Sequence, residues 1–191
     1  TARVLEKGEF AVCFGVNNYF LAWSADSVAY DLLTFDIMLR YGIVNNLEFA
    51  LKYSYPAAAL ARLKYGILKK PVAIAAEFGI GRYKMTNQAY RTDCVIDLYP
   101  GIIVEKHIYK GISLFAAPKL IYSFYIADRV GQPQSLARKT QRCYQYGYAW
   151  GIAWGNKKTS FNLENNWYWS KYEKVTYKVH QIGFGITRFF E

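Results

Sequence analysis

Apolar and polar residues alternate at every second position along most of this chain. Residues 47–55 place Leu, Phe, Leu, Tyr and Tyr at odd positions and Glu, Ala, Lys and Ser between them. Residues 33–41 and 112–124 repeat the pattern. Strict alternation is typical of a strand with one apolar and one polar face. Only residues 56–68 hold a run of good helix formers, and this run alternates too. The pattern therefore predicts an all-β chain.

Turn-forming residues divide the alternating runs in a regular way. Short polar connections at residues 44–46, 69–71, 109–111 and 156–158 take turns with longer ones at 24–30, 55–57, 85–91 and 127–141 and a break near 173–174. The sequence shows no internal repeat and no domain boundary, so we expect one domain over residues 1–191, with both ends of the chain on the side of the short turns. The predicted strands, ten in number, cover residues 8–23, 31–43, 47–55, 57–68, 72–84, 92–107, 111–126, 142–155, 159–172 and 175–190.

Ten antiparallel strands with no protected edge predict a closed, up-and-down β-barrel. Alternation alone fits a soluble, lipocalin-like barrel and a transmembrane barrel equally well, because it does not say which face points outward. Most predicted strands are 11 to 16 residues long, enough for a tilted membrane crossing. Small residues also accompany the charges on the polar face, as at Gly147, Ala149 and Gly151. Both features favour an antiparallel transmembrane barrel with the polar face inside.

Aromatic residues on the apolar face gather towards both ends of the predicted strands. Amphipathic rings at the two lipid interfaces give this arrangement in membrane barrels, whereas a soluble barrel would bury the rings. The predicted girdle consists of Tyr53, Tyr55, Tyr122, Phe124, Tyr144, Tyr146, Trp167 and Trp169 near the longer connections, and of Tyr41, Tyr65 and Trp154 near the short turns.

The last predicted strand ends in an aromatic-rich segment, QIGFGITRFF at Gln181–Phe190. Together with the short and long connections, this segment makes the whole chain resemble the small outer-membrane β-barrel proteins of Gram-negative bacteria. The resemblance is architectural, and it implies a place in the bacterial outer membrane with periplasmic short turns and external loops. The chain differs from that family at its end, because Arg188 interrupts the alternation and Glu191 follows Phe190. No secretory signal is visible at Thr1, so we expect the numbering to start at a mature terminus.

The inward face of the predicted barrel carries six acids and five bases. Charges in a narrow lumen are costly unless they are paired, so we expect a salt-bridge network that largely fills the lumen of a structural, accessory or scaffold barrel. The alternative is a charged constriction in a narrow, porin-like pathway for small solutes. The short turn at 44–46 joins the two strands that carry Asp36, Arg40, Glu48 and Lys52, so pairing across the strands is expected among these four. The predicted inward charges are Asp36, Arg40, Glu48, Lys52, Arg62, Lys64, Glu77, Asp97, Glu105, Lys119 and Glu164.

The chain has 24 basic and 14 acidic residues among 191, a net charge of +10, and 18% aromatic residues. This composition also occurs in nucleic-acid-binding proteins. The bases, however, are spread over predicted turns and one loop, where lipid phosphates are the nearest anions. We therefore expect membrane lipid as a partner, through phospholipid or lipopolysaccharide phosphates, together with other envelope proteins and no nucleic acid.

Catalytic signals are weak, so we expect no enzyme, with a lipid-modifying barrel enzyme as the less favoured alternative. His107 lies beside a short turn, on the side away from outer-leaflet chemistry, and His180 has no serine or aspartate one or two positions away. Neither metal-ligand spacing nor a phosphate-binding loop is present, so no cofactor is predicted. The cysteines Cys13, Cys94 and Cys143 are interpreted as small apolar residues, with a Cys13–Cys143 or Cys13–Cys94 disulfide as the alternative.

Overall fold

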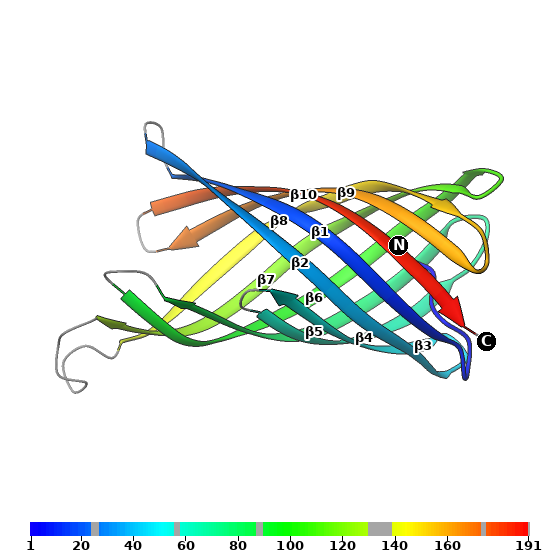
Figure 1. Cartoon of the computed structure of the whole chain (residues 1–191), viewed down its shortest axis with the longest axis horizontal. Helices are drawn as coiled ribbons and strands as arrows, with labels where there is room; N and C mark the ends of the chain where they lie inside the picture. Colours follow the sequence, from blue (N-terminus) through cyan, green and yellow to red (C-terminus); the bar gives the residue numbers. More distant parts are fainter. Residues whose placement is uncertain (24–26, 56–57, 87–89, 130–138, 173–174, 191) are drawn as a thin grey trace.

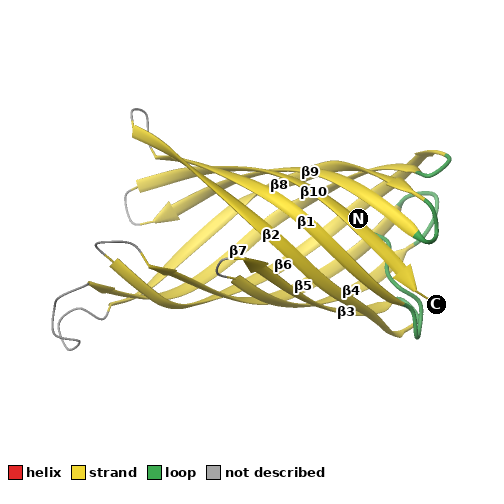
Figure 2. Cartoon of the chain, viewed as in Figure 1, coloured by secondary structure: helices red, strands yellow, loops and turns green. Residues whose placement is uncertain are grey.

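The computed structural model describes residues 1–23, 27–55, 58–86, 90–129, 139–172 and 175–190. Antiparallel strands form one closed barrel in which each strand pairs with its sequence neighbours (Figure 1). The rest of the described chain is loop or turn, with no helix (Figure 2). The strands are β1 (Phe10–Trp23), β2 (Ser27–Val44), β3 (Leu47–Tyr55), β4 (Ala58–Leu68), β5 (Ala73–Thr86), β6 (Tyr90–Tyr109), β7 (Ile112–Arg129), β8 (Lys139–Gly155), β9 (Thr159–Tyr172) and β10 (Val175–Phe190).

The first and last strands close the barrel. Their register runs without interruption from Phe10 opposite Phe190 to Trp23 opposite Tyr177. Short turns lie at one end of the barrel, together with the C-terminus (Figure 1). The left-handed backbone that tight turns require occurs there at Asn46 (φ 69°) and Gly111 (φ 74°). The predicted fold class, an antiparallel barrel of ten strands, is thus confirmed.

Several strands extend further towards the long-connection end than the sequence predicts. β2 begins at Ser27, β8 begins at Lys139, and β6 and β7 pair as far as Tyr90 opposite Arg129. Backbone hydrogen bonds continue a ladder without apolar side chains, so alternation underestimates strand length where the ladder continues beyond the apolar pattern. β1, in contrast, starts at Phe10, two residues later than predicted.

The outward face of the barrel is apolar and exposed around its circumference. Phe35, Leu51, Phe78, Trp150 and Phe184, on five different strands, each expose about half of their surface. The inward face holds small, polar and charged residues instead. This is the reverse of a soluble barrel and the arrangement of a transmembrane one. No helix in the described residues is long and apolar enough to cross a membrane.

Candidate functional site in the barrel lumen

The residues before β1 fold into the lumen from the short-turn end. We call residues 1–9 the N-terminal segment. Ala2 is 4% exposed and packs in one cluster with inward residues of β5 to β8, among them Ala75, Phe115 and Ala149. Leu5 is fully buried beside Ala11 and Phe189. The N-terminal segment therefore fills the lumen at this end.

Hydrogen bonds along the N-terminal segment fix its position. The amide of Gly8 donates to the carbonyl of Gly42 (2.9 Å), and the amide of Gly42 donates to the carbonyl of Glu9 (2.9 Å). A Cβ on Gly42 would lie 1.8 Å from the carbonyl oxygen of Glu6. This contact at the end of β2 therefore requires glycine. The late start of β1 has a separate cause. The backbone of Gly8 has a φ of +86°, so the strand cannot begin before this residue.

Glu48 is the centre of the buried charges below this segment. Its carboxylate accepts two hydrogen bonds from Arg40, from Nε at 2.8 Å and Nη2 at 2.6 Å. Nζ of Lys64 lies 3.4 Å from the same carboxylate and Nη2 of Arg62 lies 3.8 Å from it. Glu48 also accepts a hydrogen bond from the amide of Leu5 (3.1 Å). One acid thus joins three bases and the N-terminal segment.

The backbone carbonyl of Arg3 is a second meeting point of the same groups. It accepts hydrogen bonds from Nη2 of Arg40 (3.0 Å) and from Nζ of Lys64 (2.6 Å). The guanidinium of Arg3 lies over the ring of Phe189, 3.9 Å from its centroid. Burial lowers the pKa of this guanidinium from its ordinary value, and the carboxylate of Glu9 opposes that shift. The N-terminal segment is therefore part of the charge network.

The remaining predicted charges extend or flank this network. Arg62 also pairs with Glu77 at 3.2 Å, and Lys119 approaches the same carboxylate at 3.7 Å. Lys52 pairs with Asp36 at 2.5 Å, so the expected cross-strand pairs Arg40–Glu48 and Asp36–Lys52 both form.

Three acids make other contacts. Asp97 accepts a hydrogen bond from the hydroxyl of Tyr99 (2.8 Å), and Glu105 accepts one from the amide of Ala2 (2.6 Å). Glu164 lies opposite glycines on both neighbouring strands, Gly151 and Gly183. The structure therefore places all eleven predicted charges on the inward face and gathers most of them around Glu48 and Glu77.

The lumen nearer the long connections is lined by neutral polar side chains. Gln181 donates to Asn17 (3.0 Å) and Asn166 donates to Gln181 (3.3 Å), while Asn17 donates to Asp36 (2.6 Å). Buried oxygens of Asp36, Asn166 and Thr34 have no hydrogen-bond partner among the described residues. Oxygens of this kind suit bound water. This half of the lumen is thus polar but less crosslinked by charge.

The eleven predicted girdle residues lie on the outward face in two groups. Near the long connections, Tyr122 contacts Tyr144 (ring centroids 4.6 Å apart), and Tyr146 stacks on Trp169 (6.0 Å). Near the short turns, Tyr41 and Tyr65 expose about half of their surface and Trp154 stacks on Phe161 (5.7 Å). The other members are Tyr53, Tyr55, Phe124 and Trp167.

The two histidines lie away from the charges around Glu48, whereas the buried thiol of Cys13 lies beside Arg40. His180 stacks on Trp167 (4.1 Å) and on Phe20 (5.6 Å), and His107 is exposed beside a short turn. Among the described residues no group of three or more His, Cys, Asp or Glu is arranged to hold a metal. Cys13 is a buried free thiol that accepts a hydrogen bond from Thr187 (3.2 Å). The Cys13–Cys143 alternative is wrong, because Cys13 is near the short turns, whereas Cys143 is near the long-connection end of β8. The side chain of Cys94 lies outside the described residues.

Sequence reasoning missed the N-terminal segment as part of the site. Its apolar residues Ala2, Val4 and Leu5 precede the first strand without alternation, so they carry no strand signal. A glycine at an inward position of β2, Gly42, is the one hint of a close backbone approach.

Comparisons with known proteins agree with the fold. No protein-family model matches the sequence, and no curated protein matches it. The structure of Neisserial surface protein A aligns with a TM-score of 0.52 at 12% identity, over 95% of this chain and 99% of that one. An outer membrane channel from Pseudomonas putida F1 aligns at 0.47 and 10% identity, over 99% and 98%. The attachment invasion locus protein of Yersinia pestis aligns at 0.44 and 14%, over 96% and 99%. Together with the closed barrel, the alignment to Neisserial surface protein A shows that the chain has the fold of the small outer-membrane β-barrels of Gram-negative bacteria.

Proposed function

We propose that this chain is an integral barrel of the bacterial outer membrane with a closed lumen, and that it acts as a structural or accessory protein of the envelope. The observation that carries the proposal is the N-terminal segment, hydrogen-bonded to Glu48 inside the barrel. A segment held by buried charges closes the short-turn end to solutes. Function then resides in the outer wall and the loops, through contacts with lipid and with other envelope proteins.

The energetics of the network support a permanently closed state. Glu48 is fully buried and Lys64 is 2% exposed. Withdrawing the N-terminal segment removes the Arg3 carbonyl from Arg40 and Lys64, and a buried cation that loses an acceptor pays a desolvation cost. Spontaneous opening is therefore unfavourable.

A narrow solute pathway is the second candidate. It is favoured by the polar lining of the other half of the lumen, where Asn17, Asn166 and Gln181 form a hydrogen-bonded chain. In that case the N-terminal segment is the constriction. We further propose that the chain has no enzymatic activity, because the ring of His180 is stacked between Phe20 and Trp167 on the outward side.

Conductance in planar lipid bilayers tests the closed-lumen proposal. The folded chain, verified by heat-modifiable mobility on gels, is expected to give no single-channel steps under conditions in which an open porin conducts. Reproducible steps whose size changes in Glu48→Ala or Lys52→Ala would establish the narrow pathway instead.

A further inference from the structure

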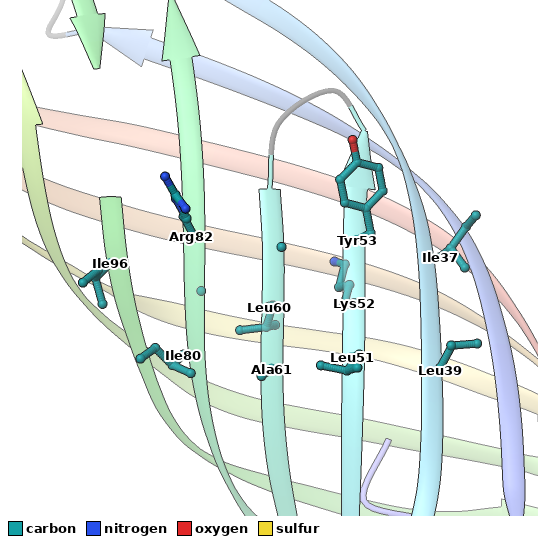
Figure 3. Close-up of a pocket in the computed structure, with 12 residues that line it drawn as sticks. Ile37, Leu39, Leu51, Lys52, Tyr53, Leu60, Ala61, Ile80, Arg82 and Ile96 are labelled. Atoms are coloured by element: carbon teal, nitrogen blue, oxygen red, sulfur yellow. The ribbon is translucent and has the colours of Figure 1, made fainter. Parts of the chain in front are cut away.

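An apolar groove runs along the outer wall over β4 (Figure 3). Its volume is about 550 Å³, within the range of ligand-binding pockets. Apart from the two cations Lys52 and Arg82, its lining residues are uncharged. The lining consists of Ile37, Leu39, Leu51, Lys52, Tyr53, Ala59, Leu60, Ala61, Ile80, Gly81, Arg82 and Ile96.

The groove exists because β4 turns two alanines outward between strands with large side chains. The register places Ala61 between Leu51 of β3 and Ile80 of β5. It places Ala59 between Tyr53 and Arg82. The alanines form the floor and their neighbours form two ridges about one strand spacing to either side. The result is a groove parallel to β4 that opens on the outside of the barrel.

One end of the groove carries a cation without an acidic partner among the described residues. Arg82 is exposed and lies near the long-connection end of β5, which ends at Thr86. Figure 3 shows Arg82 and Tyr53 on opposite sides of β4, both beside the end of the groove nearest the end of β3, while Leu39, Leu51 and Ile80 lie further down. Lys52, the other cation, instead pairs with Asp36 inside the lumen. The groove is thus apolar along its length and basic at one end.

We propose that this groove binds one acyl chain of a phosphorylated glycolipid of the lipid A type, with its phosphate at Arg82. The guanidinium of arginine matches a phosphate with two parallel hydrogen bonds, and the Tyr53 hydroxyl is a second polar group at this end, on the other side of β4. The choice of glycolipid rests on the proposed outer-membrane location, since Arg82 is at the long-connection, outward-facing end. A groove on a lipid-facing wall is in contact with acyl chains, and the charge at its end selects the headgroup.

Native mass spectrometry of the detergent-solubilised chain with diphosphoryl lipid A tests the site. A one-to-one adduct is expected for the unchanged chain. Arg82→Gln is expected to weaken it about ten-fold through loss of the charged hydrogen bonds. Ala61→Leu fills the floor of the groove and leaves the charge at Arg82 in place. It is expected to weaken the lipid A adduct to a similar extent.

Matched controls use the same changes elsewhere on the outer wall. Lys178→Gln removes an exposed cation near the same end of β10, and Ala116→Leu enlarges an exposed alanine on β7. Both are expected to bind as the unchanged chain does. Lipid A without phosphates is expected to bind weakly to the unchanged chain. Its binding is expected to be no weaker in Arg82→Gln.

Equal adducts in all four variants would overturn the site. Binding of phosphatidylglycerol as tightly as lipid A, with the same dependence on Arg82, would overturn the choice of glycolipid. Single-channel conductance would refute the closed-lumen function but leave these results unchanged, so the two proposals fail separately.

Discussion

Leu5 and Glu48 are joined inside the barrel by a 3.1 Å hydrogen bond from the Leu5 amide to the Glu48 carboxylate. The same carboxylate binds Arg40 and Lys64, and both of these cations return to the N-terminal segment at the carbonyl of Arg3. The N-terminal segment and the buried charges consequently form one unit, and a change in either is expected to be felt in the other.

Glu48→Gln is expected to destabilise the barrel strongly. The substitution keeps the size of the side chain but leaves Arg40 and Lys64 buried without their shared counter-charge, a loss of about 3 to 5 kcal/mol in comparable cases. Urea unfolding of the chain in lipid vesicles, followed by tryptophan fluorescence, measures it. Glu6→Gln is the control, because Glu6 and Lys69 form an exposed pair at 3.6 Å and exposed pairs contribute little. Equal stability of the two variants would refute the central role of Glu48.

Gly42→Ala is expected to displace the N-terminal segment while the barrel remains folded. The added Cβ meets the carbonyl oxygen of Glu6 at 1.8 Å, and backbone cannot move aside as a flexible side chain does. Trypsin is then expected to cleave rapidly after Arg3 and Lys7, as followed by mass spectrometry. The matched control is Gly15→Ala, whose Cβ would have its nearest neighbour at 3.4 Å. Slow cleavage in both variants would argue against a docked segment.

A variant that lacks residues 1–6 is expected to conduct ions in planar bilayers. Deletion removes Leu5 and the Arg3 carbonyl from the lumen, and the polar half of the lumen then continues to the short-turn end. The double variant Glu6→Gln, Lys69→Gln alters the same region only at an exposed pair, and it is expected to stay closed. If the shortened chain gives no steps, side chains alone close the lumen.

Trp150 and Trp169 are expected to lie at different depths in the bilayer. Trp150 is opposite Asn165, and Trp169 is opposite Tyr146 in the outer girdle. Four residues of tilted strand separate the two levels by about 10 Å. In variants that retain one tryptophan, bromine near the acyl-chain ends should quench Trp150 most, and bromine near the glycerol should quench Trp169 most. Identical depth profiles would contradict the girdle.

The alternating pattern predicts the strands of this barrel well, but it predicts the contacts inside the lumen only in part. The bounds of β3, β9 and β10 agree with the predicted ones because their apolar pattern continues to the turn on each side. The same period of two predicts which charges point inward, because a shift of one residue along a strand would turn all of its inward side chains outward. Which charges meet is a different question, because it depends on side-chain direction across the lumen.

Lys64 illustrates why partners are hard to predict. Its register neighbours are the two acids Glu48 and Glu77. Its ammonium group lies near Glu48 and binds the Arg3 carbonyl, while Glu77 is paired with Arg62. The deciding group is a backbone carbonyl from a segment without any periodic pattern, and its partners are 37 and 61 positions away in sequence.

We expect the contact between Arg3 and Phe189 to form late in the assembly of this barrel. Phe189 belongs to β10, the last strand, whose neighbour on one side is β1. The surface that receives the N-terminal segment is therefore complete only when β10 has paired with β1. Contacts that span almost the whole sequence form late. The N-terminal segment is thus expected to dock after β1 and β10 have paired, and its burial marks a closed barrel.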